Sequence, residues 1–199
     1  MKIRILTVVM LLNFFAIGFG ASNLIYMENG VSWSSTNGFV LDKSATSYQG
    51  LVGWRFFKKS ILDLSAEAGY RANGGAAGIE INDDNGVLME ESNVDFLFDY
   101  ITADMMIGVS DRIGNFEFNA GVGPRLDFGV NTKSDIMKTR TVMYGLKCNV
   151  GVAYCLNRLQ IGVRAGYLPN FNGLYYDVID KKYARSSSLT FGITVGWQL

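Results

Sequence analysis

The stretch from Val142 to Leu156, VMYGLKCNVGVAYCL, alternates between two kinds of side chain along its whole length. The even positions are apolar, with a Tyr near each end, and the odd positions are small or polar and include Lys147. Side chains of a strand alternate between its faces, so the pattern predicts one long strand with two different environments. Fifteen residues exceed the about 5–6 of a usual soluble strand but suffice for a tilted membrane-spanning strand, which needs about 9–11.

Seven other segments alternate in the same way, and the connections between them are alternately long and short. The connections at 58–60, 111–115 and 157–158 are short, whereas 73–98 reads as a protruding hairpin and 169–187 as a long loop. Outer-membrane barrels have an even number of strands, short periplasmic turns and long external loops. The chain therefore predicts an all-β, eight-stranded antiparallel up-and-down transmembrane β-barrel of the bacterial outer membrane, with both termini periplasmic. The seven segments are 25–34, 48–56, 62–72, 101–109, 116–130, 159–167 and 189–199.

Glycine indicates which face of the strands lies inside the barrel. Ten glycines fall on the polar face, where a narrow eight-stranded lumen requires small side chains but a solvated outer face does not. A soluble lipocalin-like barrel remains the less favoured alternative. Aromatic residues near the strand ends lie on the apolar face, as in interfacial girdles. This predicted girdle consists of Trp33, Tyr48, Tyr70, Tyr144, Tyr154, Tyr167 and Trp197.

The polar face then brings charged side chains into the lumen. Buried charges persist only when they are paired and hydrogen-bonded, so five acids facing five bases predict an interlocked salt-bridge plug. A proton or ion path through these groups is the functional alternative. The predicted lumenal residues are Glu28, Arg55, Glu67, Arg71, Asp104, Glu117, Arg125, Asp127, Lys147 and Arg164. Pro124 lies on the apolar face of the fifth strand and predicts a local irregularity, because proline lacks a ladder donor.

The first twenty residues differ from the rest. Lys2 and Arg4 precede an apolar run, and Gly18 and Gly20 supply small residues at the cleavage-critical positions. This arrangement is typical of a secretory signal peptide, and cleavage after Gly20 would leave residues 21–199 as the barrel domain. An uncleaved anchor helix is the alternative.

The two cysteines, Cys148 and Cys155, lie on the same predicted strand. At about 3.3 Å per residue they are roughly 23 Å apart, and their odd separation points them to opposite faces. A disulfide requires Cα atoms within about 7 Å. The sequence therefore predicts two unpaired thiols, one toward lipid and one toward the lumen.

Few residues suggest chemistry. The chain contains no His, which excludes Ser-His and Asp-His catalysis, and we expect neither an enzyme nor a cofactor. The acidic turn at 83–85 could bind Ca²⁺ with Glu90 and Glu91, but it lacks EF-hand spacing and is better read as a solvated turn.

Balanced charge, with 18 Lys and Arg against 18 Asp and Glu, gives no reason to expect nucleic acid. A binding surface on an external loop could use Tyr175, Tyr176, Asp177 and Tyr183.

Several segments resemble the Bacteroidota outer-membrane β-barrel domain family, which includes PorT-like proteins. The resemblance covers about residues 48–199 and departs from the family at Thr102 and Asp104, where Glu and Pro are usual, and at Leu199, where an aromatic residue is usual. It implies an outer-membrane location, and some relatives assist protein secretion or gliding. The resemblance is carried by 100–107, 116–125 (FEFNAGVGPR), 144–146 with 151–153, and 159–167.

The sequence thus predicts a small non-enzymatic outer-membrane barrel with a structural or surface-interaction role. An accessory component of a secretion or transport apparatus is the alternative that the resemblance implies. The expected partners are outer-membrane lipid and lipopolysaccharide, the barrel-assembly machinery during biogenesis, and a protein of the surface or of a secretion complex.

Overall fold

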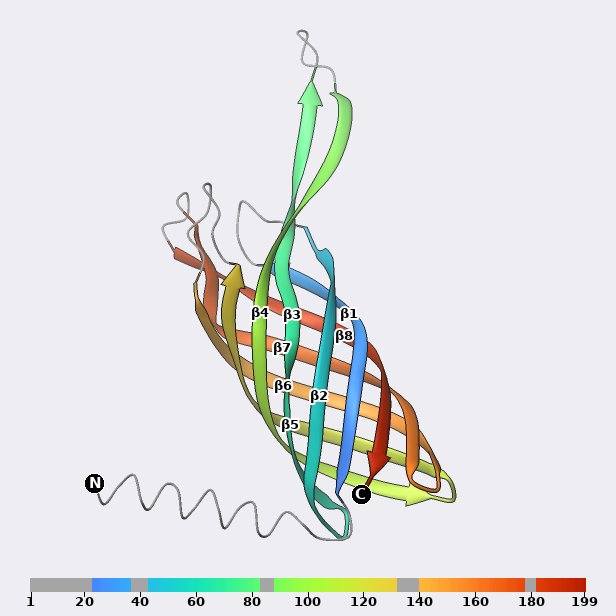
Figure 1. Cartoon of the computed structure of the whole chain (residues 1–199). Coiled ribbons are helices and arrows are strands. Elements are labelled where there is room, and N and C mark those ends of the chain that lie inside the picture. Colours follow the sequence, from blue (N-terminus) through green and yellow to red (C-terminus); the bar gives the residue numbers. More distant parts are fainter. Residues whose placement is uncertain (1–22, 37–42, 83–87, 132–139, 178–181) are drawn as a thin grey trace, which may run out of the picture.

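Eight antiparallel strands form a closed barrel in the computed structural model (Figure 1). The structure describes residues 23–36, 43–82, 88–131, 140–177 and 182–199, with side chains at all of these except 79–82, 88–93, 131, 175–177 and 182. Consecutive strands pair, and β1 pairs with β8 to close the ring, so the predicted fold is confirmed. The strands are β1 (Leu24–Thr36), β2 (Ala45–Lys59), β3 (Leu62–Asn82), β4 (Leu88–Ile113), β5 (Phe116–Asn131), β6 (Val142–Leu156), β7 (Leu159–Asp177) and β8 (Lys182–Gln198).

Two predictions fall outside the described residues. They are the signal peptide at 1–20 and the acidic turn at 83–85. In the ranges that the structure describes, no helix is both long enough and apolar enough to cross a membrane.

The two ends of the barrel differ in their connections. At one end, called the turn end here, two-residue turns at 60–61, 114–115 and 157–158 join consecutive strands. Their first residues have positive φ angles of 53° to 62°, which Gly and Asn adopt with the least strain. Leu24 pairs with Gln198, so both described chain ends lie at the turn end (Figure 1).

The opposite end, called the hairpin end, is dominated by an extension of β3 and β4. These strands pair without a break in register from Leu62↔Val109 to Ile81↔Glu90 and project beyond the rest of the barrel (Figure 1). The predicted protruding hairpin is confirmed.

Strand extension also corrects the predicted loops. Residues 169–187 are not a long loop, because β7 continues to Asp177 and β8 begins at Lys182, with Tyr176 paired to Tyr183. Register shifts between Pro169 and Tyr175 accommodate this extension, and alternation could not reveal a strand that breaks its own register. The connection expected at 111–115 is likewise shorter, since β4 runs to Ile113.

A β-bulge in β2 changes which residues face the lumen. The pairing of β2 with β3 shifts between Arg55 and Phe57, so Phe57 lies opposite Leu64 and Lys58 lies opposite Asp63. A bulge adds one residue and reverses the alternation that follows it. Lys58 therefore turns inward, although strict alternation from Arg55 would place it outside.

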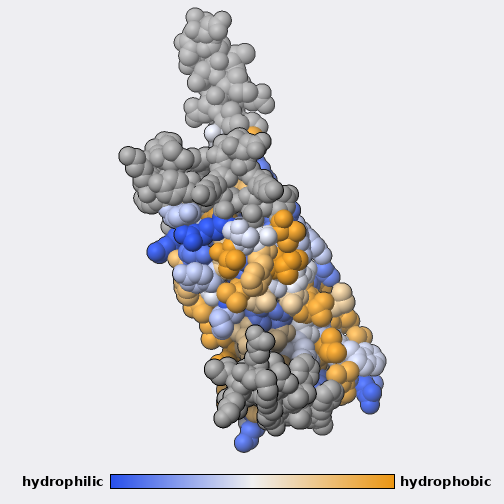
Figure 2. All heavy atoms as spheres, turned by 60° about the vertical axis from the view of Figure 1, so that its left-hand side comes forward, coloured by the Kyte–Doolittle hydropathy of each residue, from blue (hydrophilic) through white to orange (hydrophobic). Residues whose placement is uncertain are grey.

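The outer wall of the barrel is apolar. Figure 2 shows hydrophobic side chains across the visible part of the wall. On the outer wall, Ile107, Val150 and Ile193 have exposed fractions of 63%, 59% and 60%. An exposed apolar surface of this extent marks contact with a membrane or a partner, and its position around a closed barrel matches a lipid-facing band.

The cysteines lie as the alternation predicts. Both are free thiols; Cys155 is buried in the lumen, while Cys148 is half-buried on the other face of β6. The prediction that they form no disulfide is confirmed.

β5 lies unusually close to β4 at Gly123. A Cβ atom at this position would lie 1.8 Å from the backbone oxygen of Met105. The register between the strands is the same on both sides of the neighbouring Pro124, with Asp104 opposite Arg125 and Ile107 opposite Val122. The predicted irregularity at Pro124 is therefore a local interruption of the pairing between β4 and β5, without a shift of register.

We expect Gly123→Ala to destabilise the barrel by about 1–3 kcal/mol, because β4 would have to move away. The heat-modifiable gel shift, measured across a urea series, reports the change. Gly114→Asn is the matched control. Gly114 has φ +62° and open space around it, which Asn tolerates. Equal stability of Gly123→Ala and the wild type would contradict the close approach.

Candidate functional site: the charged lumen

The ten charged side chains predicted to face the lumen all lie inside the barrel. Arg55 and Arg164 are the most exposed of those in ion pairs, with 12% and 13% of their side chains accessible. From the hairpin end to the turn end, the charges form three clusters. We call them the hairpin-end, central and turn-end clusters.

The central cluster places three carboxylates around two cations. The Lys147 ammonium contacts Glu67 and lies 3.2 Å from Asp104 Oδ2. Arg164 Nη1 donates to Glu67 Oε1 at 2.8 Å and to Glu28 Oε2 at 3.0 Å. Both cations therefore bridge two carboxylates, and strands β1, β3, β4, β6 and β7 are joined across the lumen.

Neutral side chains complete the central cluster. The Tyr26 hydroxyl donates to Glu67 Oε1 at 2.5 Å, and the Arg164 guanidinium lies 4.8 Å from the centre of the Tyr26 ring. Gln49 Nε2 donates to Glu28 Oε1 at 2.8 Å. Each additional donor offsets part of the desolvation of a buried carboxylate.

The hairpin-end cluster has the opposite charge balance. Arg125 Nε lies 3.0 Å from Asp127 Oδ2, and Arg71 Nη1 lies 4.0 Å from Asp127 Oδ1. Arg71 Nε also donates to Gln49 Oε1 at 3.1 Å, and Arg125 Nη2 donates to Asn170. The hairpin-end cluster has two cations and one carboxylate, and the central cluster has two cations and three carboxylates. The two clusters together are therefore neutral. Gln49 links them, because it also binds Glu28.

An apolar cluster of buried side chains, called the cap here, lies beyond the hairpin-end cluster. It consists of buried side chains from β4, β6, β7 and β8, with exposed fractions of 4% or less. Tyr100 belongs to the cap, and its hydroxyl donates to the backbone oxygen of Arg140 at 3.2 Å. The members of the cap are Phe98, Tyr100, Met143, Leu174 and Ala184.

The turn-end cluster is centred on Glu117. Its carboxylate accepts from Arg55 Nη1 at 2.6 Å, from Lys58 Nζ at 3.1 Å and from Gln160 Nε2 at 3.0 Å. Asp63 adds a weaker contact, with Oδ2 lying 4.0 Å from Arg55 Nη1. Glu117 is thus held from β2 and β7 at once.

The sequence prediction misses the network members Tyr26, Asp63 and Lys58, and also the amide side chains of Gln49, Gln160 and Asn170. Tyr26 and Asp63 have the inward parity of their strands, so alternation could have included them. Lys58 could not be found in this way, because the bulge after Arg55 reverses its face. In addition, a search for charged residues does not find a neutral polar side chain such as Tyr26.

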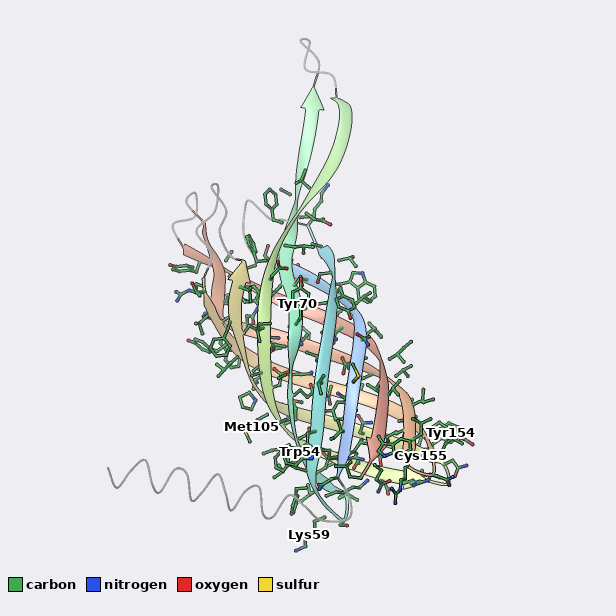
Figure 3. All side chains as sticks on the ribbon, in the orientation of Figure 1. Trp54, Lys59, Tyr70, Met105, Tyr154 and Cys155 are labelled. Atoms are coloured by element: carbon green, nitrogen blue, oxygen red, sulfur yellow. The ribbon has the colours of Figure 1, made fainter. Side chains whose placement is uncertain are left out.

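All seven residues of the predicted aromatic girdle lie on the outer wall, with exposed fractions between 37% and 54%. Figure 3 shows Tyr154 at the turn end and Tyr70 toward the hairpin end. The hydroxyls have polar partners: Tyr70 donates to Asp99, Tyr48 donates to Asn29, and Tyr154 accepts from Asn115. An apolar ring with a satisfied hydroxyl suits a membrane–water boundary.

The candidate loop-binding residues lie on paired strands and not in a loop. Tyr175, Tyr176 and Asp177 end β7, and their side chains lie outside the described part of the structure. Tyr183 is the second residue of β8 and has an exposed fraction of 39%, and the Arg140 guanidinium lies 4.0 Å from its ring centre. Among the described residues, no cluster of three or more His, Cys, Asp or Glu could hold a metal ion.

We expect Lys147→Met to destabilise the barrel by about 3–5 kcal/mol, because it leaves Asp104 as a buried carboxylate without its cation. Removing that carboxylate as well, in Lys147→Met with Asp104→Asn, should restore much of the loss, since Glu67 keeps Arg164. Lys58→Met is the milder control, because Glu117 keeps Arg55. Urea midpoints of the heat-modifiable form measure all three. Equal losses in the single and double variants would contradict the pairing.

The plug and the cap lead us to expect no steady open current in planar bilayers. The apolar cap excludes water, and the paired charges fill the lumen beneath it. Recovery of the heat-modifiable form from the same membranes controls for insertion of folded protein. A sustained current from folded protein would refute the plug and favour the ion path.

No family model and no curated protein matches the chain, so the resemblance to the Bacteroidota family stays a prediction. The chain is similar to solved outer-membrane proteins at low identity. OprG from Pseudomonas aeruginosa matches with a TM-score of 0.55 and 11% identity, over 89% of this chain and 95% of that chain. Neisserial surface protein A matches at 0.50 and 14%, over 88% and 97%.

The outer membrane protease OmpT from Escherichia coli is more distant, with a TM-score of 0.42 and 9% identity, over 89% of this chain and 97% of that chain. Similarity at these identities establishes architecture and not activity. The chain has the fold of the small eight-stranded outer-membrane β-barrels.

Proposed function

We propose that this protein is a non-enzymatic barrel of the bacterial outer membrane that binds a surface partner through its β3–β4 hairpin. The exposed apolar wall supports the location, because it would meet lipid and lipopolysaccharide around the whole ring. In this orientation the turn end faces the periplasm together with both chain ends. The barrel-assembly machinery would insert the chain.

The observation that carries the proposal is the pair of free strand edges on the hairpin. The last pair of β2 with β3 is Gln49↔Arg71, and the outermost pair of β4 with β5 is Asp99↔Asn131. Beyond them, residues 72–82 and 88–98 pair with each other, and the one further bridge among the described residues is Lys43↔Ala76. Ala76 is already bonded to Lys43 through its N–H and C=O, whereas the other outward N–H and C=O groups of these edges can pair with an added strand.

The composition of this hairpin fits strand addition. Positions 74–78 are GGAAG, so small side chains flank the β3 edge. On β4, Val94 and Leu97 are exposed at 38% and 39%. A partner strand would gain main-chain hydrogen bonds along the edge and apolar contacts beside it. We therefore infer that the partner presents an extended segment.

The charged lumen supports a structural role for the barrel itself. Its carboxylates are engaged by cations and amide donors, and the cap covers them on the hairpin side. An enzyme would require a nucleophile, a base and a substrate cavity at one place. The charged side chains of this lumen are instead paired with one another. An accessory role in secretion rests on the resemblance alone and has no specific contact in its favour.

We expect replacement of residues 74–97 by Asn-Gly, beyond the Asn73↔Phe98 pair, to abolish partner binding while the barrel still folds. The measurement is crosslinking in native membranes followed by purification of the protein, with wild type and variant compared band by band. Heat-modifiable migration of the variant confirms that the barrel is intact. As a matched control, Val163→Leu changes the lipid-facing wall, where Val163 is 57% exposed, and should leave the crosslink unchanged.

Retention of the same crosslinked partner at the same yield after the hairpin is shortened would contradict the proposal. A stoichiometric complex of secretion proteins that survives shortening would favour the accessory role.

A further inference from the structure

Two cavities lie in the lumen on the turn side of the central cluster. A cavity of about 40 Å³ lies beneath the central cluster, bounded by Tyr26 and Arg164. A second cavity of about 260 Å³ lies at the turn end. The two share Leu24, Arg55 and Glu117 in their walls, so they adjoin. We call the pair the vestibule; it is a blind recess that ends at the central cluster.

The vestibule mouth carries an excess of positive charge. Four cationic side chains line the outer cavity, and Glu117 is the carboxylate among its lining residues. Asp63, on the inner cavity, is the second carboxylate of the vestibule. With Arg164, which also lines the inner cavity, five cations against two carboxylates leave a net charge of +3. The cations of the outer cavity are Arg55, Lys58, Arg112 and Arg158.

Two of the four cations that line the outer cavity are paired with a carboxylate, and two are not. Arg55 and Lys58 are already bound to Glu117, at 2.6 and 3.1 Å. Arg112 and Arg158 are exposed at the mouth, and within the described part of the chain neither forms an ion pair. Arg112 uses only its Nε, which donates to the backbone oxygen of Gly114 at 2.9 Å. Its terminal nitrogens remain for a ligand.

We propose that the vestibule binds the carboxylate or phosphate group of a small solute that enters from the turn end. Two arginines at the rim of a recess present forked donors, the geometry that pairs with such oxyanions. The low-dielectric barrel wall focuses the field of the unbalanced cations into the recess. The outer cavity accommodates the anionic group together with several waters, whereas the inner one holds only a few waters.

Cys155 provides a built-in reporter of this site. Its thiol lines the outer cavity and lies 3.6 Å from Gln160 Nε2, and Figure 3 shows it at the turn end. A Cys148→Ser background removes the second thiol, which lies on the lipid side of the same strand. The full chain is folded in detergent and treated with methanethiosulfonate reagents. The Cys155 thiolate attacks the reagent sulfur, forms a mixed disulfide and releases methanesulfinate.

We expect the sulfonatoethyl reagent, which is anionic, to modify Cys155 about tenfold faster than the trimethylammonioethyl reagent, because the mouth concentrates anions. The ratio of the two rates for glutathione in free solution corrects for intrinsic reactivity. Inorganic phosphate should slow the modification saturably and by more than sodium chloride at the same ionic strength, which only screens the field.

The double variant Arg112→Gln with Arg158→Gln tests the assignment. It should bring the corrected rate ratio close to one and abolish protection by phosphate. Lys59→Gln is the matched control, since Lys59 is exposed at the turn end but does not line the vestibule (Figure 3). It removes one charge and should leave protection intact. Heat-modifiable migration verifies that each variant is folded.

Three results would overturn the proposal. Equal slowing by phosphate and chloride would show charge screening only. Protection that survives in the double variant would place the anion elsewhere. A Cys155 thiol that reacts with neither reagent until the protein unfolds would show that the vestibule is closed. None of these outcomes depends on the hairpin or on its partner.

Discussion

A ring of eight strands leaves an interior only about as wide as the side chains that fill it, and this chain fills it with charge. Every ion inside must therefore find a partner across the lumen, because an isolated buried charge is strongly unfavourable. Lys147 and Arg164 meet this requirement by bridging carboxylates from different strands. The same contacts tie opposite walls of the ring together, so pairing of charge and closure of the barrel support each other.

The two ends of the lumen differ: a buried apolar cluster lies toward the hairpin, and two cavities lie toward the turns. Toward the hairpin, the surplus cation of the hairpin-end cluster complements the surplus carboxylate of the central cluster, and apolar side chains such as Phe98 and Met143 cover both. Toward the turns there is no such cover among the described residues, and the outer cavity reaches the surface between Arg112 and Arg158. The barrel thus presents strand edges on one side and a basic recess on the other.

Local departures from ideal strand geometry place several functional groups. The bulge after Arg55 turns Lys58 inward, which gives Glu117 a second cation. The register shifts beyond Pro169 allow β7 to continue and bring Leu174 into the cap. At Gly123 the absence of a Cβ atom allows β5 to approach β4. Irregular positions of this kind let one sheet close, seal one end and leave the other open.

Alternation with a period of two by itself determined the fold, the lipid-facing wall and the inward direction of the ten lumenal charges, because in a strand parity alone selects the face. It also separated Cys148 from Cys155. Only the tertiary structure decided which charges meet, since partners such as Lys147 and Glu67 lie 80 positions apart and are joined by barrel closure. It likewise decided the place of Lys58 and the extent of β7 and β8, because bulges and register shifts reverse parity without a signal in residue type.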